Sequence, residues 1–138
     1  MENDYSGKER RKYKRVKLSL TVVYRTKEPL EVRLKTDERE FQASLSDISE
    51  GGTCIVTDID VAVGTVLWIR FTLAHVEQVK VNFFGTIELL GVVKYNNPLG
   101  KNLFRLGISF TNVKDSFRNE IANFVDMVDD QLKLGGSK

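Results

Sequence analysis

Apolar and polar residues alternate along most of the chain. Every second residue from Leu18 to Tyr24 is apolar, which is the period of a half-buried β-strand. Further strand-like segments follow at residues 30–34, 41–48, 53–57, 66–73, 78–95 and 103–110. Many short strands with turns between them predict a small antiparallel barrel, because closure of a sheet leaves no strand edge exposed.

Glycine and proline mark the places where this pattern bends or stops. Gly85 and Gly91 lie inside the long segment 78–95 and predict a bulge or a barrel bend in place of a flat strand. Residues 96–100, with the sequence NNPLG, predict a hairpin loop before the last strand.

The period changes near the C-terminus. Apolar residues recur there at helical spacing, with polar residues between them, at Phe117, Ile121, Phe124, Val125, Val128 and Leu132. This pattern predicts one amphipathic helix of about four to five turns. Asp115 or Ser116 is a suitable N-cap, and Gly135-Gly136 a suitable end. We expect the helix to cover one opening or flank of the barrel.

Composition narrows the class of protein. The chain has 138 residues and one cysteine, so we expect one domain without an internal disulfide, in the cytoplasm. No apolar run reaches the roughly 18 residues of a membrane span. The net charge of +2 hides an asymmetry, because residues 1–17 carry seven Lys or Arg against three acids. We expect a flexible basic arm at 1–16, a barrel with its helix at 17–134 and a tail at 135–138.

The arm contains an Arg-x-x-x-Arg pair, Arg11 and Arg15, with Arg10 beside it. A guanidinium donates two parallel hydrogen bonds to a phosphate, or to O6 and N7 of guanine, and stacks on bases. Residues four apart share a face of a helix or of a strand. Both forks can therefore face one anionic ligand.

A second motif, Asp47-Ile48-Ser49-Glu50-Gly51-Gly52, ends a predicted strand. An ionised carboxylate only accepts hydrogen bonds, so Asp47 suits the Watson–Crick N–H groups of guanine and would repel a phosphate. The hydroxyl of Ser49 can donate to a base or phosphate oxygen. Gly51 and Gly52 allow positive φ and a close approach of the backbone to a ligand.

The two motifs together resemble those of the PilZ family of cyclic di-GMP receptors, RxxxR followed by D/N-x-S-x-x-G. The strand Leu106-Gly107-Ile108-Ser109-Phe110 is also similar to the family's last strand. The resemblance spans about residues 8–132. It implies an all-β fold with one C-terminal helix, a six-stranded antiparallel barrel. It also implies that cyclic di-GMP binds, without metal or other cofactor, at Arg11, Arg15, Asp47, Ser49, Gly51 and Gly52, and we add Arg10, the third arginine of the arm, to this set.

The resemblance implies a receptor and not an enzyme, a monomer or homodimer without membrane insertion. Its arm would close over the ligand and signal to an unidentified protein effector of motility, biofilm or exopolysaccharide production. We further expect Arg10 to stack on an outer guanine and to favour two bound ligand molecules per chain.

Other interpretations of the same residues remain open. The arm is also typical of a solvated tail, and Asp47 to Gly52 of a turn that bonds its own backbone. A protein-interaction adaptor of the same fold would ignore nucleotides. A barrel that binds RNA or DNA would use exposed aromatic residues among the basic ones, and Tyr13 is the one obvious candidate. Cys54 is typical of a small buried apolar residue, and lone His75 lacks partners for a metal site.

Overall fold

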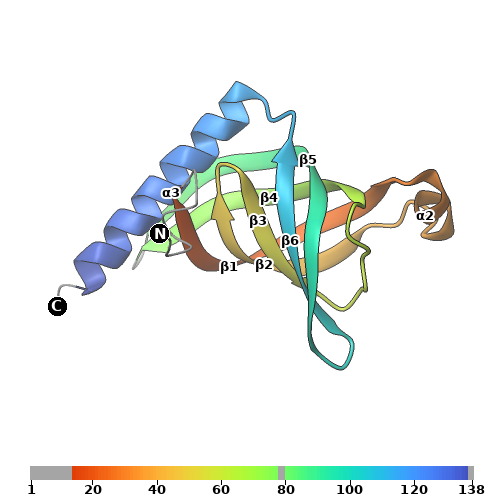
Figure 1. Cartoon of the computed structure of the whole chain (residues 1–138). Coiled ribbons are helices and arrows are strands. Elements are labelled where there is room, and N and C mark those ends of the chain that lie inside the picture. Colours follow the sequence, from red (N-terminus) through yellow and green to blue (C-terminus); the bar gives the residue numbers. More distant parts are fainter. Residues whose placement is uncertain (1–13, 78–79, 137–138) are drawn as a thin grey trace, which may run out of the picture.

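The structure is a computed structural model that describes residues 14–77 and 80–136. Two helices and six strands lie within these residues (Figure 1). In chain order they are β1 (Arg15–Glu28), α2 (Leu30–Lys35), β2 (Phe41–Ser49), β3 (Gly52–Thr57), β4 (Val66–Glu77), β5 (Lys80–Gly100), β6 (Leu103–Thr111) and α3 (Asp115–Gly136). The predicted combination of six strands with one late helix is confirmed.

The strands pair in the order β1-β2-β3-β6-β5-β4, and the sheet closes into a barrel. All the pairings are antiparallel. Closure depends on β1, whose residues 15–24 pair with β2 and whose residues 22–28 pair with β4. The first residue of β1 therefore lies opposite the end of β2, which carries the second sequence motif.

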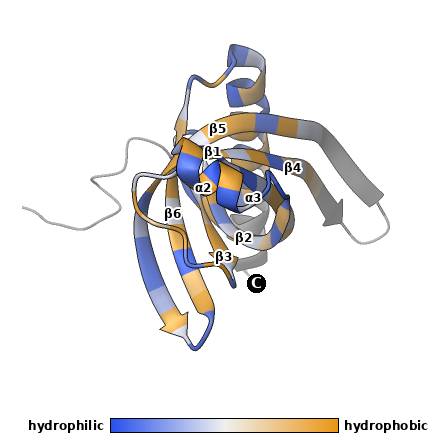
Figure 2. Ribbon diagram, turned by 90° about the vertical axis from the view of Figure 1, so that its right-hand side faces the viewer, coloured by the Kyte–Doolittle hydropathy of each residue, from blue (hydrophilic) through white to orange (hydrophobic). Residues whose placement is uncertain are grey.

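The barrel interior is filled by one face of each strand. Apolar and polar positions alternate along the strands in Figure 2, and the apolar ones include Val22, Leu45, Ile55 and Ile69, all fully or almost fully buried. β5 contains the predicted bulge, since Leu73 pairs with Gly85 whereas Ala74 pairs with Phe83. The extra residue bends the strand, as closure of a small barrel requires.

Helix α3 lies across one end of the barrel, against β1, β2, β4 and β5 (Figure 1). Ile121, Phe124, Val125 and Val128 are buried in the same core as the strands. Their spacing of three and four residues places them on one helix face. The helix predicted from the sequence is thereby confirmed, and it begins at Asp115.

The predicted strand at residues 30–34 is wrong, because these residues form the short helix α2. Leu30 and Leu34 are about 60% exposed (59% and 64%), so their spacing serves no buried sheet face. Pro29 precedes the helix in an extended conformation, and Thr36 closes it through hydrogen bonds to the carbonyl of Val32. The residues at the two ends, Pro29 and Thr36, therefore determine that this segment is a short helix and not a strand.

The predicted loop at residues 96–100 is also wrong, because β5 continues to Gly100. Asn96 pairs with Leu106 and Pro98 with Phe104, and the turn lies at residues 101–102. The pairing of β4 with β5 ends at Val92, which leaves this part of β5 as an edge. Proline is tolerated in an edge strand because its missing N–H removes no ladder bond there.

Two further observations concern the limits of the domain. β1 begins at Arg15, so Arg15 and the buried Val16 belong to the barrel and not to the expected arm. Among the described residues, no helix combines the length and apolarity that a bilayer crossing requires.

The contact between α3 and the barrel yields a stability prediction. Phe124 is 1% exposed, so Phe124→Ala leaves a cavity under the helix. We expect the free energy of unfolding, measured by urea denaturation, to fall by about 3–5 kcal/mol. Val63→Ala, at a 61% exposed site, is the control and should change it by less than about 0.5 kcal/mol. Similar losses in the two variants would contradict the packing described here.

Candidate ligand-binding site

A pocket of about 270 Å³ lies where the start of β1, the β2–β3 turn, β5 and β6 meet. It is lined by residues of two groups. The β1, β2 and β3 group is Arg15, Ser49, Gly51, Gly52, Thr53 and Cys54, and the β5 and β6 group is Lys94, Tyr95, Gly107, Ile108 and Ser109. The pocket thus joins parts of both sequence motifs to strands that carry neither motif.

Register explains why these residues meet. Arg15 pairs with Ser49 between β1 and β2. A row of paired residues runs across β2, β3, β6 and β5. In this row Asp47 pairs with Cys54, Cys54 with Gly107, and Gly107 with Tyr95. We call these four residues the transverse row. Residues paired in this way share a face of the sheet.

The transverse row lies on the outer face of the barrel. Ile48 and Ile55 are fully buried core residues, and they directly follow Asp47 and Cys54 in the chain. Successive side chains of a strand point to opposite faces. The pocket is therefore a surface feature that the barrel supports from beneath.

Asp47 is the most unusual polar group of the site. It is 4% exposed and lies between two guanidinium groups. Arg15 Nη1 is 3.6 Å from Oδ1, and Arg105 Nη2 is 3.7 Å from Oδ2. These distances are too long for hydrogen bonds, and both Oδ1 of Asp47 and Nε of Arg15 are buried without one among the described residues.

A buried polar atom that lacks a hydrogen bond is costly and rare in native proteins. The charge of Asp47 is balanced by the two arginines, but its Oδ1 accepts no hydrogen bond among the described residues. The same holds for Nε of Arg15. Asp47 Oδ1 and Arg15 Nε are therefore a buried acceptor and a buried donor next to the pocket, although Asp47 itself does not line it.

Ser49 has a structural role in the turn. The N–H of Gly51 donates to its Oγ at 3.2 Å, and its hydroxyl donates to the carbonyl of Gly52 at 3.4 Å. The N–H of Phe110 donates to the carbonyl of Gly51 at 2.9 Å and ties the turn to β6. The alternative interpretation of the motif, a turn whose side chains bond their own backbone, thus holds for Ser49 and not for Asp47 Oδ1, and Ser49 also lines the pocket.

The role predicted for the two glycines is wrong in one respect. Neither Gly51 nor Gly52 is among the described residues with positive φ. Gly52 is needed for a different reason, since a Cβ there would collide with the backbone carbonyl oxygen of Ile108. The glycine therefore allows β3 and β6 to approach closely beneath the pocket.

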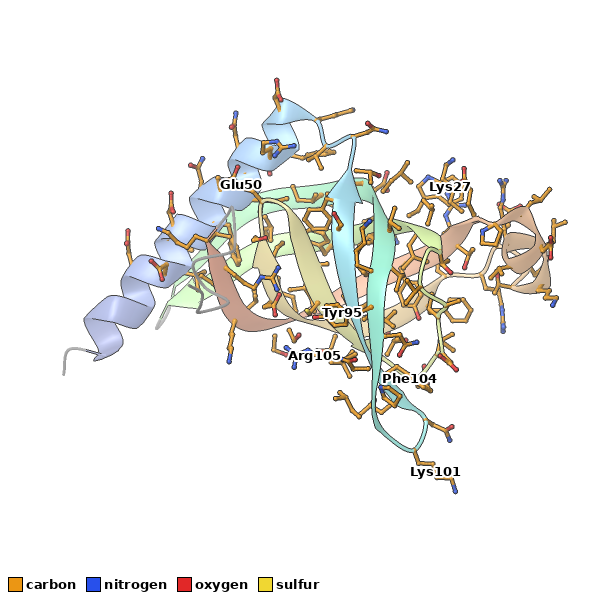
Figure 3. All side chains as sticks on the ribbon, viewed as in Figure 1. Lys27, Glu50, Tyr95, Lys101, Phe104 and Arg105 are labelled. Carbon is orange, nitrogen blue, oxygen red and sulfur yellow. The ribbon has the colours of Figure 1, made fainter. Side chains whose placement is uncertain are left out.

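Tyr95 lines the pocket and Arg105 forms an ion pair with Asp47, although neither residue lies in a sequence motif. They lie close together near the base of the β5–β6 hairpin (Figure 3). The Tyr95 hydroxyl is 2.8 Å from Cys54 Sγ. Burial is the main cause that raises the pKa of Tyr95 to about 12, and the contact with Cys54 is the next. The residue as a whole is 38% exposed. A glycine inside the last predicted strand, Gly107, was the one sequence signal of a close approach here.

Lys14, the first described residue, lies beside α3. Lys14 Nζ lies 3.0 Å from Asp126 Oδ1 and 3.5 Å from Asp129 Oδ2, and the hydrogen bond to Asp126 raises the pKa of Lys14. Arg10 and Arg11 lie outside the described residues. Within residues 14–77 and 80–136, no three His, Cys, Asp or Glu residues are grouped to hold a metal ion.

The family model for the PilZ domain matches residues 9–127. The chain belongs to the PilZ family. The match covers most of the chain and includes Arg11, Arg15 and the Asp47 to Gly52 motif. No curated protein sequence matches the chain.

Solved structures share the PilZ fold. The PilZ domain of Escherichia coli YcgR with c-di-GMP has 17% identity and a TM-score of 0.65, covering 94% of this chain and 98% of that one. The Bacillus subtilis inhibitor of motility MotI (DgrA) has 19% identity and a TM-score of 0.63, covering 89% and 52%. The K. pneumonia MrkH–c-di-GMP complex has 13% identity and a TM-score of 0.60, covering 93% and 54%. The chain thus spans about half of MotI and of MrkH.

The environment of Tyr95 yields a titration prediction. Its folded-state pKa lies above the usual value of 10, so its contribution to stability is complete below about pH 10 and is lost as pH rises toward 12. We expect the tyrosinate absorbance of the wild type minus that of Tyr95→Phe to rise with a midpoint near pH 12.

Circular dichroism at each pH restricts this comparison to folded protein, because an unfolded tyrosine titrates near 10. A difference titration centred at pH 10 in folded protein would contradict both the burial of the hydroxyl and its contact with Cys54.

Proposed function

We propose that this PilZ domain is a receptor for cyclic di-GMP. The supporting observation is the pocket itself, which joins Arg15 to Ser49, Gly51 and Gly52 with the buried Asp47 beside them. These residues come from both motifs that the sequence singled out. The structures of YcgR and MrkH named above, with c-di-GMP, share the fold.

The unused hydrogen-bonding atoms suit the two parts of this ligand. Asp47 Oδ1 would accept hydrogen bonds from the Watson–Crick N–H groups of one guanine, and the guanidinium of Arg15 would donate to phosphate or to guanine O6 and N7. Arg11 would supply the second fork. Gly51 and Gly52 keep the floor of the pocket free of side chains.

The size of the pocket supports closure of the arm. Pockets that enclose a drug-sized ligand usually measure roughly 300–1,000 Å³, and this one measures about 270 Å³. The barrel alone therefore covers only part of a cyclic dinucleotide. Arg10 and Arg11 would cover the remainder, and the combined surface of arm, ligand and barrel rim would bind an unidentified protein effector in motility, biofilm or exopolysaccharide control.

A second candidate function is that of a protein-interaction adaptor that ignores nucleotides. One observation favours it, since the hydroxyl of Ser49 is already engaged within its own turn. The adaptor does not account for the buried, unbonded atoms of Asp47 and Arg15. We therefore rank it below the receptor.

Calorimetric titration with cyclic di-GMP tests the receptor. We expect about micromolar or tighter binding by the wild type. Arg11→Ala and Arg15→Ala should each weaken it by about tenfold to a hundredfold or more, because each removes charge-assisted hydrogen bonds of about 1.5–3 kcal/mol.

Arg33→Ala is the matched control, because Arg33 is an ion-paired arginine of α2 that does not line the pocket. Its affinity should equal that of the wild type. A folded wild type that gives no binding heat would overturn the receptor and favour the adaptor.

Arg10 sets the expected stoichiometry. If its guanidinium stacks on an outer guanine face, the wild type should bind two ligand molecules per chain. Arg10→Ala should then bind one, with Arg11 and Arg15 intact. The fitted stoichiometry of the same titrations measures this, and one ligand per chain in the wild type would refute the role of Arg10.

A further inference from the structure

The wall of the pocket opposite Arg15 contains the aromatic ring of Tyr95, which is held in place by contacts with two neighbouring strands. β5 has a bulge at this point, because Val93 pairs with Ile108 whereas Tyr95 pairs with Gly107. Lys94 is the extra residue. A bulge redirects side chains, and two successive residues of β5, Lys94 and Tyr95, consequently line the same pocket.

The Tyr95 ring packs directly on Gly107. A Cβ at this position would collide with three atoms of the Tyr95 ring, Cδ2, Cε2 and Cζ. The ring therefore rests directly on the backbone of β6. An aromatic side chain that covers a cross-strand glycine in this way is held by backbone and not by a mobile side chain.

Cys54 fixes the far end of the ring. Cys54 and Tyr95 are the two neighbours of Gly107 in the transverse row, and their Sγ and Oη atoms meet at 2.8 Å across it. Cys54 is 2% exposed, so this anchor, its contact with the Tyr95 hydroxyl, is shielded from solvent on the Cys54 side. The ring packs on Gly107, its hydroxyl contacts Cys54, and Tyr95 lines the pocket with 38% of its surface exposed.

We infer that Tyr95 is the stacking platform for a guanine of the ligand, and that Gly107 and Cys54 hold the platform in place. This inference rests on the proposed receptor function and adds a recognition residue to it. Asp47 and Tyr95 belong to one row on one face of the barrel. A base whose edge bonds to Asp47 would thus extend along that face toward the ring.

The chemistry of stacking suits this position. A planar base gains from an aromatic face that is held still, because little side-chain entropy is lost on binding. Arg105, in an ion pair with Asp47, adds positive charge next to the platform. Neither the ring nor its hydroxyl carries a charge that would repel the phosphates.

Variants of Tyr95 separate the ring face from the hydroxyl. Tyr95→Leu removes the aromatic face and keeps apolar bulk, and we expect cyclic di-GMP to bind about 5- to 150-fold more weakly in calorimetry. Tyr95→Phe and Cys54→Ala each remove only the anchor and should weaken binding about two- to tenfold. Tyr95→Trp keeps an aromatic face and should retain most of the affinity.

The double variant Tyr95→Phe with Cys54→Ala tests the anchor more sharply. Since both changes break the same contact, the double variant should bind no more weakly than either single one. Losses that multiply would overturn the role given to Cys54. Thermal denaturation establishes that each variant is folded.

A direct signal of stacking comes from NMR. The ring protons of Tyr95, assigned by their absence in Tyr95→Leu, should shift upfield when cyclic di-GMP is added. Wild-type binding together with unchanged affinity in Tyr95→Leu would overturn the platform and leave the receptor standing. Absence of wild-type binding would overturn both.

Discussion

The register of the closed sheet is the constraint on which the site depends. β1 can close the barrel only by pairing with β2 at its start and β4 at its end, and this fixes Arg15 opposite Ser49. The same closure aligns Asp47, Cys54, Gly107 and Tyr95 across four strands. A shift of one residue in any of these pairings would turn the side chains to the opposite face. Positions far apart in the chain thus form one surface because the core behind them admits one register.

The outer surface of the barrel next to the pocket contains a buried ionic group, the carboxylate of Asp47 with two arginines. Asp47 is buried outside the apolar core, between guanidinium groups from β1 and β6. Breaking a buried ion pair from one side is strongly destabilising, because the remaining charge stays uncompensated. The two arginines share this carboxylate, so either one can turn toward a ligand while the other still balances the charge. In the proposed receptor, one arginine would therefore bind the ligand while the other keeps Asp47 in an ion pair.

The sequence was sufficient for features that depend on local pattern. The strand period, the helix of residues 117–132 and the bulge near Gly85 follow from spacing, and the structure contains all three. Residues 30–34 were misassigned because exposed Leu30 and Leu34 mimic the alternation of a strand. Tyr95 and Arg105 were missed because they reach the site only through register, which the bulge at Lys94 shifts by one residue. A motif search finds residues close in sequence, whereas half of this pocket comes from strands without a motif.

The contacts at the start of the described chain follow from the same geometry. Lys14 and Arg15 are successive residues, and their side chains diverge, one toward Asp126 and Asp129 of α3 and the other toward Asp47 of β2. Lys14 is exposed, so its ion pairs with α3 contribute little to stability. The first two described residues thus connect α3 to the candidate site, since Lys14 binds the helix and Arg15 forms an ion pair with Asp47 next to the pocket.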